Sequence, residues 1–252
     1  MGFAKQGARI ALLARSKAEL DLARLEIEQA GAVAMRIRVD VRDFEQVEAA
    51  RDRVLVQFNA LDVLVCAAGV QGPIGPLASN NPKSWAETVE TNLLGTMHAC
   101  RAVLPHMMKQ RHGKIVALSG GGAVGPRANF SAYAASKAAV VRLVETLALE
   151  VCDHNIQVNA MSPGGSYTHM TDEILSAGER AGWKDNEEAV QIRLTGGVAP
   201  EKQIALALFL ASERSNHING KLIHVNDDWK RLEHASINPE MYTLRRVLKV
   251  QP

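Results

Sequence analysis

The sequence predicts an α/β protein built on a doubly wound parallel sheet, and three observations support this prediction. Short apolar runs alternate with amphipathic stretches of helical periodicity along most of the chain. The apolar runs are continuous, as is typical of strands covered on both faces. Small or polar residues follow these runs, as expected at strand ends where ligands approach the backbone. We expect one domain over residues 1–228 and a C-terminal extension over residues 229–252.

The first elements repeat one unit of strand and helix. Residues 8–14 form a short apolar run, helical periodicity follows over residues 17–29, and Gly31 ends that helix. The same reasoning gives strands at 32–39 and 61–67 and a helix at 44–58. Residues 82–110 are expected to form one long helix or a broken pair.

The second half continues the alternation. Strands are expected at 114–118, 156–161 and 221–225, and helices at the alanine-rich segment 132–152 and at 201–211. Strands joined in this way by helices form a parallel sheet with helices on both faces, the Rossmann-like arrangement. Ligands of such sheets bind beyond the carboxyl ends of the strands.

Composition narrows the class of protein. The chain has 252 residues, 47% of them hydrophobic, and its net charge of +2 comes from 29 basic and 27 acidic residues without long runs of one sign, so no nucleic-acid partner is expected. Three cysteines lie far apart in apolar runs, which favours a reducing compartment such as the cytoplasm over disulfides. The eight histidines lack metal-ligand spacing, and no apolar run is long enough for a membrane span. We therefore expect neither a metal nor a membrane partner.

The predicted helix at 132–152 begins with a pair of residues that suits proton transfer. Tyr133 and Lys137 are four positions apart, so the phenol and the ammonium share one helical face. A tyrosine hydroxyl titrates near ~10 in water, and a neighbouring cation favours its ionised form. We therefore expect Lys137 to lower the pKa of Tyr133. The alternative is an ordinary amphipathic helix surface.

The strand-end motifs, taken in order, resemble the short-chain dehydrogenase/reductase family over about residues 2–228. The matching segments are Asp40-Val41, Cys66-Ala67-Ala68-Gly69, Thr91-Asn92, Tyr133-x-x-x-Lys137 and Ser162-Pro163-Gly164 with Thr168. The resemblance implies hydride transfer between a nicotinamide cofactor and a carbonyl or alcohol carbon.

The resemblance also implies roles for these residues. Tyr133 would be the general acid or base, Lys137 would also bind the nicotinamide ribose, and Asn92 would anchor a water that links Lys137 to solvent. The remaining matched positions would contact the cofactor: the adenine at Asp40 and Val41, the adenosine ribose at Ala67, Ala68 and Gly69, and the nicotinamide at Pro163, Gly164 and Thr168.

One departure concerns the serine that the family uses to orient the substrate, normally thirteen residues before the tyrosine. That position is Gly120 here, and Ser119 lies one residue earlier. Successive strand residues face opposite sides, so the hydroxyl of Ser119 points either into the site or into the core. The glycines that follow give the backbone freedom to turn, and we assign the role to Ser119, with Ser131 as a local substitute.

A second departure lies at the N-terminus, where residues 2–8 match the end of the family's first helix. The family's first strand and its Gly-rich pyrophosphate turn are thus not found in this sequence. Two explanations are open, namely a true start codon upstream or a truncated form with a damaged cofactor site. We favour the first.

The end of the first expected strand bears on cofactor choice. NAD-selective members of the family place an acid where this chain has Ala14, followed by Arg15 and Ser16. A guanidinium and a hydroxyl suit a 2′-phosphate, so NADP(H) is preferred and NAD(H) remains possible. The alternative is that Arg15 is an exposed flank and Ser16 a helix N-cap.

The substrate is expected to be a small carbonyl or alcohol compound covered by residues 167–196, which the family uses as a lid. The tail beyond residue 227, including the apolar segment 241–248, is expected to cover either a neighbouring subunit or the pocket. By resemblance we expect a homodimer or homotetramer. The competing interpretation is a non-catalytic relative that keeps the fold for binding or assembly.

Overall fold

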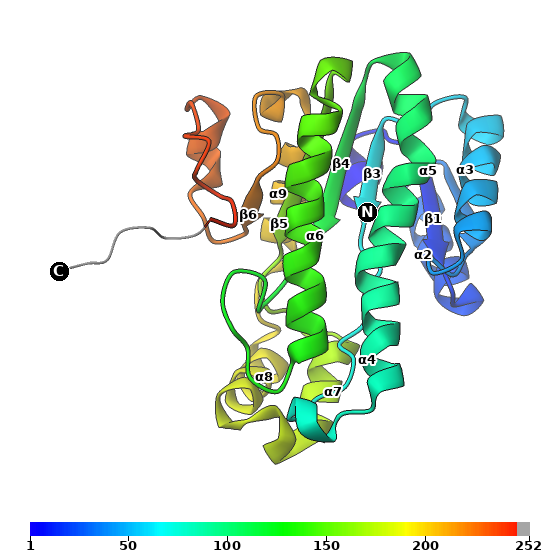
Figure 1. Ribbon diagram of the computed structural model, residues 1–252. Helices are drawn as coiled ribbons and strands as arrows, with labels where there is room; N and C mark the ends of the chain where they lie inside the picture. Colours follow the sequence, from blue (N-terminus) through cyan, green and yellow to red (C-terminus); the bar gives the residue numbers. More distant parts are fainter. Residues whose placement is uncertain (246–252) are drawn as a thin grey trace.

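Parallel strands flanked by helices make up the chain, and the computed structural model describes residues 1–245 (Figure 1). The strands are β1 (Ile10–Ala14), β2 (Ala34–Arg38), β3 (Val63–Cys66), β4 (Gly113–Leu118), β5 (Ile156–Ser162) and β6 (Leu222–His224). β1 and β2 pair in one parallel sheet, and β3, β4, β5 and β6 pair in that order in a second. The predicted α/β class with parallel strands is confirmed.

The helices follow the predicted order, with additions. They are α1 (Gly2–Lys5), α2 (Lys17–Gln29), α3 (Phe44–Phe58), α4 (Pro82–Val89), α5 (Gly95–Gln110), α6 (Ser131–Glu150), α7 (His169–Ala177), α8 (Trp183–Thr195) and α9 (Pro200–Leu210). Helices α7 and α8, in residues 167–196, are not among the predicted helices. Apolar side chains of α8 such as Trp183 and Leu194 are exposed, so the segment lacks the one-sided pattern of a buried helix.

Helices cover both faces of the larger sheet, as the alternation along β4 demonstrates. Ile115 and Ala117 belong to an apolar cluster with residues of α5 and α6, whereas Val116 belongs to a second cluster with Leu206 and Phe209 of α9. In Figure 1, α5 and α6 lie in front of the sheet and α9 behind it. The doubly wound layering is therefore present around β3–β6.

The two sheets do not join through the described residues. β1 pairs only with β2, and β3 pairs only with β4. Leu13 of β1 is 41% exposed and Val65 of β3 is 38% exposed, although strands of a parallel sheet normally bury such side chains. Within residues 1–245 no hydrogen bonds connect β1 with β3, so the parallel strands form two sheets.

Residues 82–110, predicted to form one long helix or a broken pair, form the broken pair. Asn81 caps α4 by accepting from the backbone N–H groups of Lys83 and Ser84, and Pro82 takes the first helical position. A π-helical turn at Glu90–Leu94 then separates α4 from α5. Such turns disturb the regular ladder and are frequent at functional sites. Thr91 and Asn92 are buried in it.

The tail packs against the chain's own sheet. Trp229 and Leu232, from the short 3₁₀ helix η6 (Trp229–Glu233), join the same apolar cluster as Phe209 of α9. The backbone N–H of Leu222 in β6 donates to the carbonyl of Tyr242 over 2.8 Å. Within residues 227–245 the tail therefore covers the β6 side of this chain. The end of the predicted apolar segment, residues 246–248, lies outside the described residues.

Candidate active site

The first two turns of α6 hold Tyr133 and Lys137 beside the end of β4. Tyr133 is 8% exposed and Lys137 is 4% exposed. The Lys137 Nζ donates to the carbonyl oxygen of Leu118, the last residue of β4, over 2.8 Å. The same Nζ lies 5.7 Å from the centroid of the Tyr133 ring. The helical face predicted from the sequence thus meets the carboxyl end of the sheet.

Asn92 joins this pair from the π-helical turn. Its side chain is fully buried, its Oδ1 accepts from the N–H of Val70 over 2.8 Å, and its Nδ2 donates to the Val70 carbonyl over 3.0 Å. The Nδ2 also lies 3.0 Å from Ser136 Oγ, which donates to the carbonyl of Tyr133. Asn92 therefore ties the loop after β3 to α6.

Gly69 approaches these polar groups closely. A Cβ at this position would lie 3.3 Å from Asn92 Oδ1 and 3.5 Å from Lys137 Nζ. The Met170 Cε atom would be the third neighbour, at 3.8 Å. Residues from the ends of β3 and β4, the π-helical turn and α7 thus converge at one place, which agrees with the strand-end rule.

Burial governs the protonation of the pair. It raises the pKa of the Tyr133 hydroxyl, and the cation that opposes this increase is Arg127. Burial also lowers the pKa of Lys137 to about 8. The expectation of an acidified phenol is therefore wrong, because the loss of solvation outweighs the nearby positive charge.

Gly120 lies directly against the side chain of Tyr133. A Cβ there would overlap the Tyr133 hydroxyl, so a serine at this position would require the tyrosine side chain to shift. Ser119 is 3% exposed, and its Oγ has no hydrogen-bond partner within the described part of the chain. Ser131 Oγ instead accepts from Trp85 Nε1 over 3.1 Å.

The predicted nucleotide-binding residues near β1 and β2 are more exposed. Arg15 is exposed, and its carbonyl accepts from Arg38 Nε over 3.1 Å. Ser16 caps α2 by accepting from the N–H of Glu19 over 3.3 Å. Hydrogen bonds from Arg42 lower the pKa of Asp40 to about 2. The Val41 carbonyl lies 2.8 Å from His98 Nδ1.

The other predicted cofactor positions lie at strand ends of the larger sheet. Ala67 and Ala68 follow β3 and are exposed, whereas Pro163 and Gly164 follow β5 and are half-buried. Gly164 has φ +71, and a Cβ would lie 2.7 Å from Val198, so this turn requires glycine. Thr168 is the N-cap of α7, in a capping box with Thr171.

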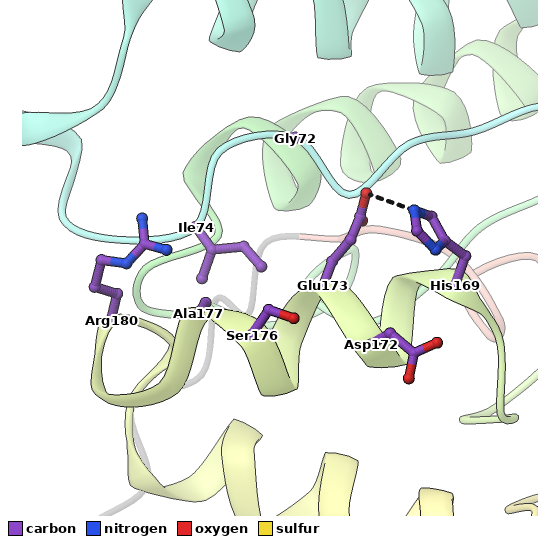
Figure 2. A pocket seen from close by; sticks show the side chains of 8 residues that line it. All are labelled: Gly72, Ile74, His169, Asp172, Glu173, Ser176, Ala177 and Arg180. Carbon is purple, nitrogen blue, oxygen red and sulfur yellow. Dashed lines mark ion pairs between the residues drawn. The ribbon is translucent and has the colours of Figure 1, made fainter.

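A surface pocket of about 330 Å³ opens beside α7 (Figure 2). Its wall combines Ile74 of the loop after β3 with Ala177, and both pack with Tyr133 in one apolar cluster. His169 and Glu173 line it with an ion pair of 3.7 Å, and Figure 2 places Arg180 at the other end. An apolar wall and a charged rim suit a small polar molecule.

Two classes of site are absent from residues 1–245. No group of three or more His, Cys, Asp or Glu side chains gathers there as a metal site. Within the same residues, no helix combines the length and hydropathy that crossing a bilayer requires.

The fold and the site together define an α/β protein with a buried tyrosine–lysine pair at the carboxyl ends of its parallel strands, and comparison with known proteins gives the family. Residues 1–178 match the model of the short chain dehydrogenase family. The 3beta-hydroxysteroid dehydrogenase 1 of Eggerthella lenta is 33% identical over 202 residues, covering 79% of this chain and 75% of that protein. The 2,3-dihydro-2,3-dihydroxybenzoate dehydrogenase of Bacillus subtilis is 32% identical over 228 residues, covering 85% and 84%.

Solved structures agree with the family match. An actinorhodin polyketide ketoreductase with NADPH has a TM-score of 0.81 and 27% identity, over 89% of this chain and 88% of that one. NAD+-bound xylitol dehydrogenase has a TM-score of 0.80 and 27% identity, over 88% and 90%. The chain therefore belongs to the short-chain dehydrogenase/reductase family, and the resemblance inferred from its motifs is confirmed.

Proposed function

We propose that the chain transfers a hydride between NADP(H) and the carbonyl or secondary alcohol carbon of a small molecule. The observation that carries this proposal is the convergence of Tyr133, Lys137 and Asn92 at the carboxyl ends of β3 and β4. A bound nicotinamide supplies the hydride, and the residues of this chain supply the accompanying proton. Proton transfer by a positioned side chain is general acid–base catalysis.

Tyr133 is the proposed proton donor in reduction and acceptor in oxidation. Its raised pKa keeps the hydroxyl protonated at neutral pH, which is the state needed to protonate a carbonyl oxygen. Lys137 binds the nicotinamide ribose, and the positive charge of its ammonium stabilises the phenolate left after the transfer. Asn92 holds the loop after β3 against α6 and anchors the water that returns protons to Lys137.

Ser119 is the proposed partner of the substrate oxygen. Its hydroxyl is buried without a partner at the end of β4, and buried hydroxyls normally have one. A substrate oxygen in the site would satisfy it. Ser131 is the weaker candidate because its hydroxyl already accepts from Trp85.

The preference for NADP(H) rests on charge at the end of β1. Arg15 is exposed there, Ser16 follows it, and the first residue after β1 that bears a carboxylate is Glu19, inside α2. A 2′-phosphate is attracted by the guanidinium, whereas the ribose diol of NAD(H) gains no carboxylate acceptor. Asp40 and Val41 would border the adenine, Ala67, Ala68 and Gly69 the adenosine ribose, and Pro163, Gly164 and Thr168 the nicotinamide.

We further propose that another strand pairs with both β1 and β3 and carries the Gly-rich turn for the pyrophosphate. Leu13 and Val65 leave apolar surface exposed on these two strands, and their outer edges lack backbone partners within residues 1–245. A buried edge without partners would cost about 1–3 kcal/mol for each unsatisfied group. A strand in this position would join the two sheets.

Substrate entry, cellular compartment and assembly complete the proposal. The substrate is a small molecule that enters beside α7, where the 330 Å³ pocket shares Ile74 and Ala177 with the cluster around Tyr133. Cys66 and Cys100 are buried free thiols, which suits the reducing cytoplasm. Assembly into a homodimer or homotetramer is proposed by family resemblance alone.

Titration with NADPH tests the proposed function, first on this chain and then on a form that adds the strand and the Gly-rich turn. Binding by the extended form, followed by reduction of a carbonyl compound, would support the proposal. Absence of binding by both forms would favour a non-catalytic relative. NADH titrated in parallel measures the cofactor preference.

A further inference from the structure

Arg127 connects the proton-transfer residues with the helices that follow β5. It lies in the loop between β4 and α6, and its Nε donates to Asp185 Oδ1 of α8 over 2.7 Å. Both side chains are shielded, with 19% and 18% of their surfaces exposed. The two residues are 58 positions apart in the sequence, so tertiary folding alone brings them together. A shielded pair of this kind is screened less by solvent and salt than a surface pair.

The guanidinium also lies against the aromatic side chains of the site. The Arg127 Cζ is 3.8 Å from the centroid of the Phe130 ring and 5.9 Å from that of Tyr133. Phe130 is fully buried and packs with Tyr133 in one apolar cluster. Arg127 is thus held between a carboxylate on one side and two rings on the other, so its position and that of the Tyr133 ring depend on each other.

The same loop is held at a second point, Asn129. Its carbonyl accepts from the N–H of Gly75 over 2.8 Å. On the side of the α7–α8 segment, a Cβ at Gly182 would lie 3.3 Å from Asn129 Nδ2. The loop before α6 therefore touches both walls of the site, and Arg127 provides its ionic contact with α8.

We propose that Arg127 is a positioning residue of the active site, which, held by Asp185, fixes the ring of Tyr133 and ties the loop before α6 to α8. The proposal rests on the proposed function for the role of Tyr133. The charged groups that face Tyr133 are Arg127 from the loop and Lys137 from α6. In the apolar cluster around Tyr133, the loop after β3 contributes Ile74, and α7 contributes Met170, Ile174 and Ala177. Burial raises the pKa of Tyr133, and the positive charge of Arg127 opposes this effect. Loss of that charge should therefore raise the pKa of Tyr133 further.

A titration of the tyrosine side chains tests the first half of the proposal without any turnover. The chain has three tyrosines, so ¹³Cζ labelling gives three NMR signals, and Tyr133→Phe identifies the signal of Tyr133. Arg127→Met should raise the titration midpoint of Tyr133 by about half a unit to one unit, and Arg127→Lys should retain part of the effect. An unchanged midpoint in folded Arg127→Met would overturn the proposal.

Hydrogen exchange tests the second half through a variant on the other side of the contact. Asp185→Asn should accelerate amide exchange in α8 about fivefold, because the contact that holds the helix to the loop is weakened. The matched control is Glu28→Gln, which breaks the exposed Arg24–Glu28 pair on α2 and should leave α8 unchanged. Equal exchange in α8 for Asp185→Asn and the parent chain would overturn the proposal, even if Arg127→Met does not fold. Neither measurement needs cofactor, so a failure of the proposed function remains distinguishable.

Discussion

The proposed proton-transfer region and the proposed nucleotide-binding region of this protein are built differently. Tyr133, Lys137 and Asn92 are buried and held by packing and by hydrogen bonds between distant segments. Arg15 is exposed, at the end of a strand that belongs to the separate two-stranded sheet. The described residues therefore hold the proposed proton-transfer groups together, whereas the proposed cofactor residues are divided between the two sheets.

The largest effect is expected for Tyr133→Phe in a form that binds NADPH. The ring keeps its packing, but the proton donor is lost, so turnover should fall at least about 100-fold. Loss of NADPH absorbance with a panel of carbonyl compounds measures the rate. Tyr242→Phe, in the tail, is the matched control and should keep full activity. An unreduced rate in Tyr133→Phe would remove the basis of the proposed function.

Asn92→Ala tests whether the proton-transfer region is a unit of stability. The fully buried amide bonds both backbone groups of Val70 and lies within hydrogen-bond distance of Ser136. Its removal leaves buried polar groups unpaired and should lower the free energy of unfolding by about 2–4 kcal/mol. Urea denaturation measures this loss. Asn80→Ala, where the amide donates one bond to the Gly75 carbonyl, should cost less than about 1.5 kcal/mol. Equal losses in the two variants would contradict the prediction.

Lys137→Met should stabilise the protein and remove its activity. Burial lowers the pKa of Lys137 from 10.5 to about 8, so below pH 8 the folded state bears the cost of a desolvated ammonium. The variant should gain about 1–3 kcal/mol of unfolding free energy at pH 7 and lose catalytic activity. Between pH 8 and 10.5 the unfolded chain binds the proton more than the folded one, so the parent becomes more stable as pH rises and the difference disappears.

Lys114→Met is the control for this effect. Lys114 is also buried, with a pKa lowered by burial to about 8, but it lies near the other end of β4 and donates to Asn216. It should show a similar pH-dependent gain in stability while activity is kept. A gain in neither variant would show that both ammonium groups are fully compensated in the folded state.

The smallest expected effect belongs to the exposed nucleotide region. Arg15→Ala should weaken NADPH binding about tenfold in a form that binds the cofactor and leave NADH binding and urea stability unchanged. Calorimetric titration with both cofactors measures the ratio. Lys17→Ala, on the first turn of α2, is a control for the general loss of positive charge. A similar loss of affinity for NADH would mean that Arg15 does not recognise the 2′-phosphate.

Much of this arrangement could be predicted from the sequence, because periodicity follows burial. The bounds of α2 and α3 agree with the prediction at both ends, and the helical spacing of Tyr133 and Lys137 gave their common face. The π-helical turn at Glu90–Leu94 and the contact of Arg127 with Asp185 could not be predicted. Both result from tertiary packing, which leaves no local periodic signal. The raised pKa of Tyr133 was missed for the same reason, since desolvation depends on neighbours that are distant in sequence.

The docked tail has a consequence for how copies of this chain can meet. An exposed strand edge is a template for backbone pairing with another molecule. At β6 the tail occupies part of that edge, since the Leu222 N–H donates to the Tyr242 carbonyl. The Lys221 ammonium donates to the carbonyls of Pro239 and Met241 and holds the tail in this place. A chain that ends before residue 239 would therefore expose this edge of β6 for pairing with another molecule. We expect such a shortened protein to aggregate more readily than the parent.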